Sequence, residues 1–146
     1  MSRARAALAA AVLALLAAAA PARAGTALGL GADWLTEPSA GLLQLTLAAD
    51  RGVARGLTLG GRIGALVGTD GIGPGVPIDL RLRLRVDRLY VDGLVGPWVF
   101  FDDGDAVRVH GAIGFGLVQR GGLQVGLEIG YVDPTASVGV RLAWPF

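Results

Sequence analysis

Ser137-Val138-Gly139-Val140-Arg141-Leu142-Ala143-Trp144-Pro145-Phe146 is a stretch in which apolar residues alternate with other residue types. Side chains of an extended strand point alternately to its two faces. One face of this stretch is therefore apolar and the other is not. The apolar face consists of Val138, Val140, Leu142, Trp144 and Phe146, and its last two members are aromatic. The stretch predicts an amphipathic β-strand whose one charge, Arg141, lies on the opposite face.

Seven further alternating runs precede this one, and segments rich in Gly, Pro or Asp separate them. We therefore predict an all-β chain of eight antiparallel strands in an up-and-down barrel. Most runs have about nine to eleven residues, the length of a strand that crosses a bilayer at a tilt. The predicted strands are Thr26–Trp34, Gly41–Ala49, Leu57–Val67, Ile78–Val86, Leu89–Phe101, Val107–Val118, Leu123–Tyr131 and Val138–Phe146.

Charged residues within these runs all fall on the face opposite the apolar one. That face holds Arg62, Asp79, Arg81, Arg83, Arg85, Asp92, Arg108, His110, Glu128 and Arg141. A soluble barrel would turn its apolar face inward, whereas a membrane barrel turns it toward lipid. Only 22 of the 122 residues from Gly25 onward are charged, below the roughly 25–35 % typical of a soluble surface. The composition favours a transmembrane barrel.

Residues 1–24 have the features of a cleaved signal peptide. Arg3 and Arg5 precede an apolar run, and Ala22-Arg23-Ala24 fits an Ala-x-Ala cleavage pattern. The folded domain would then be residues 25–146. The chain has no Cys, which excludes disulfides and thiol chemistry. Without residues 1–24 the net charge is −2, so no basic field for nucleic acid remains.

The connections between the runs alternate in charge. Those after the second, fourth and sixth runs carry four arginines, Arg51, Arg55, Arg88 and Arg120, and two acids, Asp50 and Asp87. The other connections carry only acids, namely Glu37, Asp70, Asp102, Asp103, Asp105 and Asp133. With both chain ends in the periplasm, the acidic connections would lie outside the cell. Aromatic girdles would follow, with Trp34, Phe101 and Tyr131 at the outer interface and Trp144 and Phe146 at the inner one.

The signal peptide, the eight amphipathic runs and the aromatic end of Val138–Phe146 together resemble the small eight-stranded outer-membrane barrels of Gram-negative bacteria, of the OmpA-transmembrane and OmpX type. The resemblance covers residues 25–146. It implies an outer-membrane location, contact with outer-membrane lipid and lipopolysaccharide, and recognition of Val138–Phe146 by the barrel-assembly machinery. It implies no cofactor. The outer connections are very short here, which argues against the adhesive surfaces that relatives carry there.

Charges on the inward face predict an ion-pair cluster inside the barrel. A two-residue turn at Asp87-Arg88 would pair Arg83 with Asp92. Longer connections would place Glu128 opposite Arg141, or two residues away, and Arg62 near Arg81 or Arg83. Eight strands leave an interior just wide enough for side chains to fill. The predicted cluster is Arg62, Arg81, Arg83, Arg85, Asp92, Glu128 and Arg141. It would fill and lock the lumen, and an anion-attracting passage is the alternative.

Catalytic and metal-binding motifs find little support. Gly-Ala follows His110, whereas a lipid A deacylase of the small-barrel type would show His-x-Ser, and the only serines after residue 24 are Ser39 and Ser137. One His without Cys makes no conventional transition-metal site. Asp102, Asp103 and Asp105 offer oxygens for Ca²⁺ or Mg²⁺, although a solvated acidic turn is the simpler interpretation.

We therefore predict a structural outer-membrane barrel that is not an enzyme. Two alternatives stay open. One is a narrow channel or small-solute transporter, and the other is a soluble periplasmic or secreted ligand-binding barrel. The sequence leaves the ligand, any protein partner and the oligomeric state undetermined.

Overall fold

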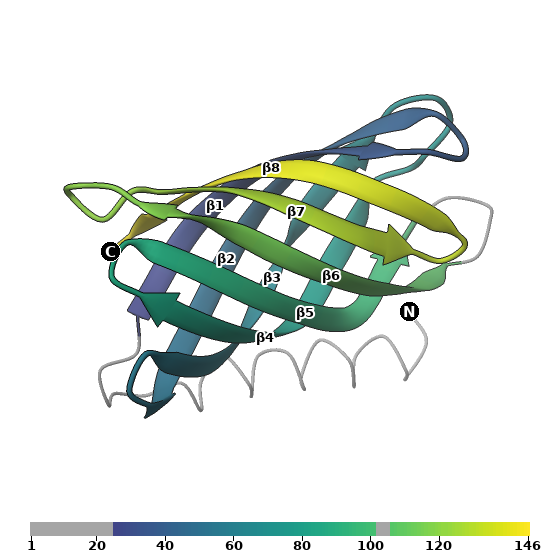
Figure 1. The fold of residues 1–146 in the computed structure, drawn as a ribbon. Coiled ribbons are helices and arrows are strands. Elements are labelled where there is room, and N and C mark those ends of the chain that lie inside the picture. Colours follow the sequence, from purple (N-terminus) through teal and green to yellow (C-terminus); the bar gives the residue numbers. More distant parts are fainter. Residues whose placement is uncertain (1–24, 102–105) are drawn as a thin grey trace.

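Eight antiparallel strands, each hydrogen-bonded to the next, close into a barrel when β8 pairs with β1 (Figure 1). The computed structural model describes residues 25–101 and 106–146. The signal peptide predicted for residues 1–24 and the acidic group Asp102, Asp103 and Asp105 lie outside them. The strands are β1 (Gly25–Leu35), β2 (Ala40–Ala54), β3 (Leu57–Gly68), β4 (Gly75–Val86), β5 (Leu89–Phe100), β6 (Val107–Val118), β7 (Gln124–Val132) and β8 (Thr135–Pro145).

All eight predicted strands are confirmed, and β2 differs most from its predicted bounds. It continues to Ala54 because the real turn is the two-residue Arg55-Gly56, where Gly56 has a φ of 74°. Glycine adopts this left-handed conformation without steric cost. The Gly and the charges just before this turn suggested a loop, but they belong to the paired strand. No helix within the described residues is long and apolar enough to cross a membrane.

The predicted division into two faces is also confirmed. Leu43, Leu82 and Ile129 are examples of the apolar side chains that are exposed on the outer wall. The charged side chains Arg62, Asp79, Arg81, Arg83, Asp92, His110 and Glu128 are buried inside. In a barrel of this kind an exposed apolar wall is the surface that contacts lipid.

Strand register follows the prediction at the Asp87-Arg88 turn, takes the predicted two-residue alternative between β7 and β8, and departs from the prediction between β3 and β4. Across β4 and β5, Arg83 pairs with Asp92 and Arg85 with Tyr90. Across β7 and β8, Glu128 pairs with Gly139, two residues from the direct pairing of Glu128 with Arg141. The reason is that the β7–β8 turn contains only two residues, 133 and 134, because Val132 already pairs with Thr135.

Arg62 is the clearest correction to the expected register. It pairs with Asp79 on β4, not with Arg81 or Arg83, because β4 begins at Gly75 and the connection from β3 is shorter than predicted. This register places opposite charges side by side, whereas the predicted one would have opposed two arginines.

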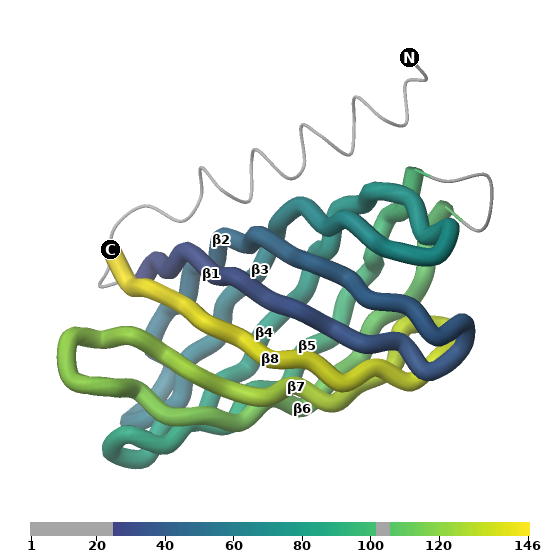
Figure 2. Tube along the Cα trace, turned by 90° about the horizontal axis from the view of Figure 1, so that it is seen from above, coloured from purple at the N-terminus to yellow at the C-terminus, as the bar shows by residue number. Residues whose placement is uncertain are grey.

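The two ends of the barrel differ in their connections. We call the end that carries the β2–β3, β4–β5 and β6–β7 turns the turn end, and the opposite end the loop end. The C-terminus lies at the turn end (Figures 1 and 2). There Thr26 on β1 makes two hydrogen bonds with Phe146. The Thr26 Oγ1 donates to the Phe146 carbonyl at 2.6 Å, and the Phe146 N–H donates to the Thr26 carbonyl at 3.1 Å.

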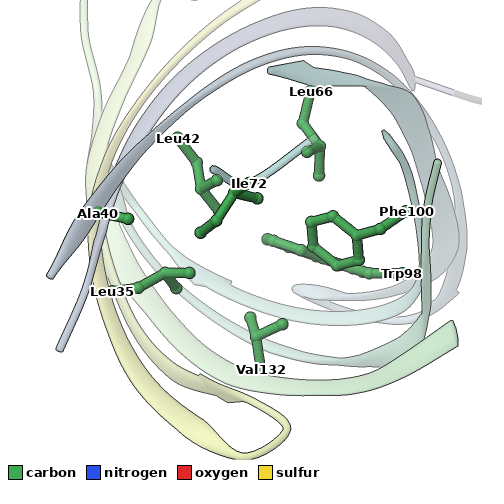
Figure 3. Packing of buried hydrophobic residues seen from close by; sticks show 8 residues of the cluster. All are labelled: Leu35, Ala40, Leu42, Leu66, Ile72, Trp98, Phe100 and Val132. Atoms are coloured by element: carbon green, nitrogen blue, oxygen red, sulfur yellow. The ribbon is translucent and has the colours of Figure 1, made fainter. Parts of the chain in front are cut away.

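Apolar side chains fill the lumen at the loop end (Figure 3). This apolar plug consists of Leu35, Ala40, Leu42, Leu66, Ile72, Trp98, Phe100 and Val132, each at most 8 % exposed. The alternating pattern predicted apolar residues on the outer wall, and the plug was not predicted. Its signal is a loss of alternation at the strand ends, where two apolar residues follow each other, as in Trp34-Leu35, Leu42-Leu43 and Tyr131-Val132.

Candidate functional site

Eight side chains, one from each strand, form a continuous hydrogen-bonded network inside the barrel. We call it the central network. Its members are Asp33 (β1), Gln44 (β2), Arg62 (β3), Asp79 (β4), Trp98 (β5), His110 (β6), Glu128 (β7) and Arg141 (β8). Trp98 belongs to the apolar plug as well, so the two layers are in direct contact. Arg62, Glu128 and Arg141 belong to the cluster predicted from the sequence, and the other five members do not.

Arg62 bridges the lumen. Its Nε and Nη2 donate to Asp79 Oδ2 at 2.9 and 2.7 Å, and its Nη1 donates to Glu128 Oε2 at 2.8 Å. Arg62 is only 6 % exposed. Hydrogen bonds from a guanidinium to carboxylates satisfy both groups in a setting where an unpaired charge would be very costly. Arg62 thereby ties its neighbour β4 to β7 across the barrel.

Asp79 joins the network to the plug. Its Oδ1 accepts hydrogen bonds from Trp98 Nε1 at 3.1 Å and from His110 Nδ1 at 2.6 Å. The His110 ring stacks on Trp98 with ring centroids 4.3 Å apart. His110 Nε2 has no hydrogen-bond partner and lies 3.7 Å from Glu128 Oε1. These contacts make His110 a buried part of the lumen packing.

Arg141 completes the network on the side where the barrel closes. Its Nη2 donates to Glu128 Oε1 at 2.7 Å and to Asp33 Oδ1 at 2.6 Å. Asp33 in turn accepts a hydrogen bond from Gln44 Nε2 at 2.5 Å. Arg141 reaches Glu128 although their backbones are not paired, since its long side chain spans the two-residue offset. Asp33 and Gln44 were detectable in the sequence as inward-facing polar residues among apolar neighbours.

A second set of ion pairs lies between the central network and the turn end. Arg83 binds Asp92 with two hydrogen bonds of 2.6 and 2.7 Å, and its Nη1 donates to Gln124 at 2.5 Å. The Arg83 guanidinium also lies 4.1 Å from the centre of the Tyr90 ring. Arg81 pairs with Asp50 rather than with a member of the predicted cluster.

Arg85 lies outside the lumen cluster to which the sequence analysis assigned it. Its side chain is exposed and its Nε donates to the Asp87 carbonyl at 2.9 Å. The register explains this position, because only Val86 separates Arg85 from the turn and the barrel interior ends there. The side chains assigned to the aromatic girdles are all exposed, namely Trp34, Phe101 and Tyr131 toward the loop end and Trp144 and Phe146 at the turn end.

A small polar cavity of about 40 Å³ remains on the turn-end side of the central network. Thr46, Arg81, Tyr90, Asp92 and Gln124 contribute to its lining. Since one buried water needs roughly 10–15 Å³ of such space, the cavity accommodates about three waters. It is too small for a metabolite, and its arginines are already paired with carboxylates.

The chain is similar to the outer-membrane enzyme PagL, with a TM-score of 0.65 and 14 % identity over 82 % of this chain and 99 % of that one. The fold is that of outer-membrane β-barrels. A structure titled "De novo design of transmembrane beta-barrels" gives a TM-score of 0.64 at 12 % identity, over 84 % of this chain and 95 % of that one. The solution structure of the designed TMB2.3 gives 0.54 at 12 % identity, covering 84 % and 94 %.

No known protein family and no curated protein matches the sequence. At identities this low the structural likeness establishes the fold and nothing further. The barrel resembles outer-membrane barrels, and the narrower assignment to the OmpA and OmpX type is not confirmed.

The likeness to PagL corrects the prediction that the chain is not an enzyme. That prediction is wrong, because an outer-membrane enzyme has a barrel of the same shape, so catalysis is compatible with this fold. In this chain His110 points into the lumen and bonds to Asp79, and neither Ser39 nor Ser137 is among its partners. The fold likeness therefore does not carry a Ser–His arrangement over to these residues.

Proposed function

We propose that the protein spans a bacterial outer membrane as a barrel with a sealed lumen. Its role would then belong to its outer wall and its two rims rather than to passage of solutes through the interior. The observation that carries the proposal is the central network, in which one side chain from every strand is tied to the others across the interior.

Two successive barriers support a sealed lumen. The apolar plug closes the loop end, and a dry apolar constriction stops ions because it cannot hold the water that they need. Behind it, Arg62 and its two carboxylate partners occupy the middle of the barrel. The polar cavity lies on one side of these layers only, so it offers no continuous path.

Two further contacts follow from the same proposal. The outer wall would contact outer-membrane lipid, with lipopolysaccharide at the loop end. The barrel-assembly machinery would read the aromatic strand Val138–Phe146 during insertion. Both rest on the exposed apolar side chains of these surfaces, among them Trp144 and Phe146.

Single-channel recording in planar bilayers tests the sealed barrel directly. Protein extracted from outer membranes should migrate differently on a gel before and after boiling, which identifies folded barrels. Such protein should give no conductance steps. The matched control is the variant Arg62→Ala/Trp98→Ala, which removes the bridge and the largest side chain of the plug and should conduct. Stable conductance of the folded wild-type protein would refute the sealed lumen and favour the narrow channel.

A further inference from the structure

Arginines divide sharply between the lumen and the turn end. The four lumen arginines, Arg62, Arg81, Arg83 and Arg141, all bind carboxylates. Five others are exposed at the turn end and bind no carboxylate of residues 25–101 and 106–146, namely Arg51, Arg55, Arg85, Arg88 and Arg120. We call these five the arginine rim. The one acid among the exposed residues of its three turns is Asp87, so the rim has a net charge of four positive.

The rim lies directly against the apolar wall. Val86 and Leu89, both exposed, flank the Asp87-Arg88 turn, so Arg88 is one residue from a lipid-facing side chain. Arg120 is in the β6–β7 turn, which lies beside the end of β8, because a Cβ on Gly122 would come within 2.7 Å of Pro145 Cγ. The exposed ring of Trp144 belongs to the residue before Pro145 at this end of β8. Charges this close to an apolar belt lie at the level of the lipid headgroups.

We infer that the arginine rim binds the phosphates of anionic phospholipids in the leaflet on the turn-end side. The inference rests on the membrane barrel proposed above. A guanidinium binds phosphate through paired N–H donors, and a cluster of four to eight basic residues beside a membrane is typical of anionic-lipid recognition. The rim arginines lie at three successive hairpins, β2–β3, β4–β5 and β6–β7, and not at a single one, which fits several surrounding lipids better than a single protein partner.

The loop end has the opposite charge, which restricts the inference to the turn end. The exposed charges described in the loop-end connections are acidic, namely Glu37, Asp70 and Asp133. Among the residues that the structure describes, the one arginine toward that end is Arg108, which is partly buried and lies 4.8 Å from the centre of the Phe100 ring. The turn end should therefore attract anionic phospholipid more strongly than the loop end does.

Quenching of tryptophan fluorescence by brominated lipids tests the inference at each end separately. The variant Trp34→Phe leaves Trp144 as the lipid-exposed reporter, since Trp98 is 1 % exposed inside the lumen. The folded variant is placed in phosphatidylcholine vesicles that contain a minor share of phosphatidylglycerol, and either lipid carries the bromine. Brominated phosphatidylglycerol should quench Trp144 in excess of its share, with a preference of roughly fivefold for an arginine in contact with the headgroup.

Two matched variants locate the preference. Replacing all five rim arginines by Gln (Arg51→Gln/Arg55→Gln/Arg85→Gln/Arg88→Gln/Arg120→Gln) in the same background should bring the preference near one. Raised salt should weaken the preference in the parent. The variant Trp144→Phe, which reports from Trp34 at the acidic end, should show no preference for phosphatidylglycerol.

The outcomes separate this inference from the proposed function. A protein that fails to show the folded gel mobility in these vesicles contradicts the membrane barrel itself. A folded protein in which both brominated lipids quench Trp144 according to their share overturns the lipid-binding rim and leaves the barrel intact. A preference that survives substitution of all five arginines would overturn it as well, because the attraction would then lie elsewhere.

Discussion

Replacing Arg83 by methionine should destabilise the barrel more than replacing its partner Asp92 by asparagine. Arg83 supplies both hydrogen bonds that Asp92 accepts. Without Arg83, the Asp92 carboxylate stays in the lumen, 6 % exposed and with no donor of its own. Breaking a buried pair in this way costs roughly 3–5 kcal/mol. The polar cavity beside Asp92 admits a few waters, so we expect the lower end, about 3 kcal/mol.

The converse substitution Asp92→Asn should be milder. The amide oxygen still accepts a hydrogen bond, and Arg83 keeps its contacts with Gln124 and the Tyr90 ring. Loss of the charge on one side of such a contact costs roughly 1–3 kcal/mol. The sequence alone suggests the opposite order, since Arg81 and Arg85 flank Arg83 on one face. In the structure Arg81 is bound to Asp50 and Arg85 points to solvent, so neither replaces Arg83.

Urea unfolding from lipid vesicles, followed by gel mobility, measures these differences. Arg83→Met/Asp92→Asn should cost less than the two single losses together, with an interaction energy of about 1–3 kcal/mol. Arg85→Met is the matched control, because it removes an exposed arginine from the same strand and should stay within about 0.5 kcal/mol. Additive losses, or a larger loss for Asp92→Asn than for Arg83→Met, would refute the reasoning.

Three further predictions concern the wall, the plug and the last strand. Leu82→Arg should cost roughly 2–4 kcal/mol, because an arginine on the lipid face near the bilayer midplane is poorly solvated, and unchanged folding in vesicles would contradict the outward orientation of this face. Trp98→Ala should cost about 3–5 kcal/mol in urea unfolding, since it empties the centre of the plug, while a loss below 1 kcal/mol would mean that the plug does not pack tightly. Phe146→Asp should lower the amount of barrel found in the outer membrane with export unchanged, and normal assembly would exclude a role for this residue in recognition.

The alternation of residue types within single strands, together with the length of the turns, determined most of what could be predicted about the fold. The alternation of Leu43, Leu45 and Leu47 with Leu42, Gln44 and Thr46 assigns each side chain to a face whatever the neighbouring strands are. A two-residue turn fixes the β4–β5 register because it allows no slack. Where the connection was longer, as between β3 and β4, the register could not be derived from spacing, and the partner of Arg62 was wrong for that reason.

Contacts that form only when the barrel closes could not be predicted from the residue pattern of single strands. Asp33 and Arg141 are separated by 108 positions in the sequence and meet because β1 pairs with β8. The apolar plug was missed for a related reason, since its members come from five strands and one loop and no single run reveals that they converge. The prediction on enzymatic activity failed for another reason, because neither the fold nor the lack of a familiar motif determines function.

The central network has a consequence for the motions of the barrel. Each of the eight strands contributes one member to this network. No strand can therefore separate from its neighbours at the height of the network without breaking one of the network's hydrogen bonds. Local opening of a single hairpin is thereby coupled to opening of the whole wall. Backbone amides beside Asp33, Gln44, Arg62 and their five partners should therefore exchange their hydrogens for deuterium at one common slow rate, set by global unfolding. Amides of the β2–β3 hairpin beyond Asp50, where the exposed strands extend past this level, should exchange much faster.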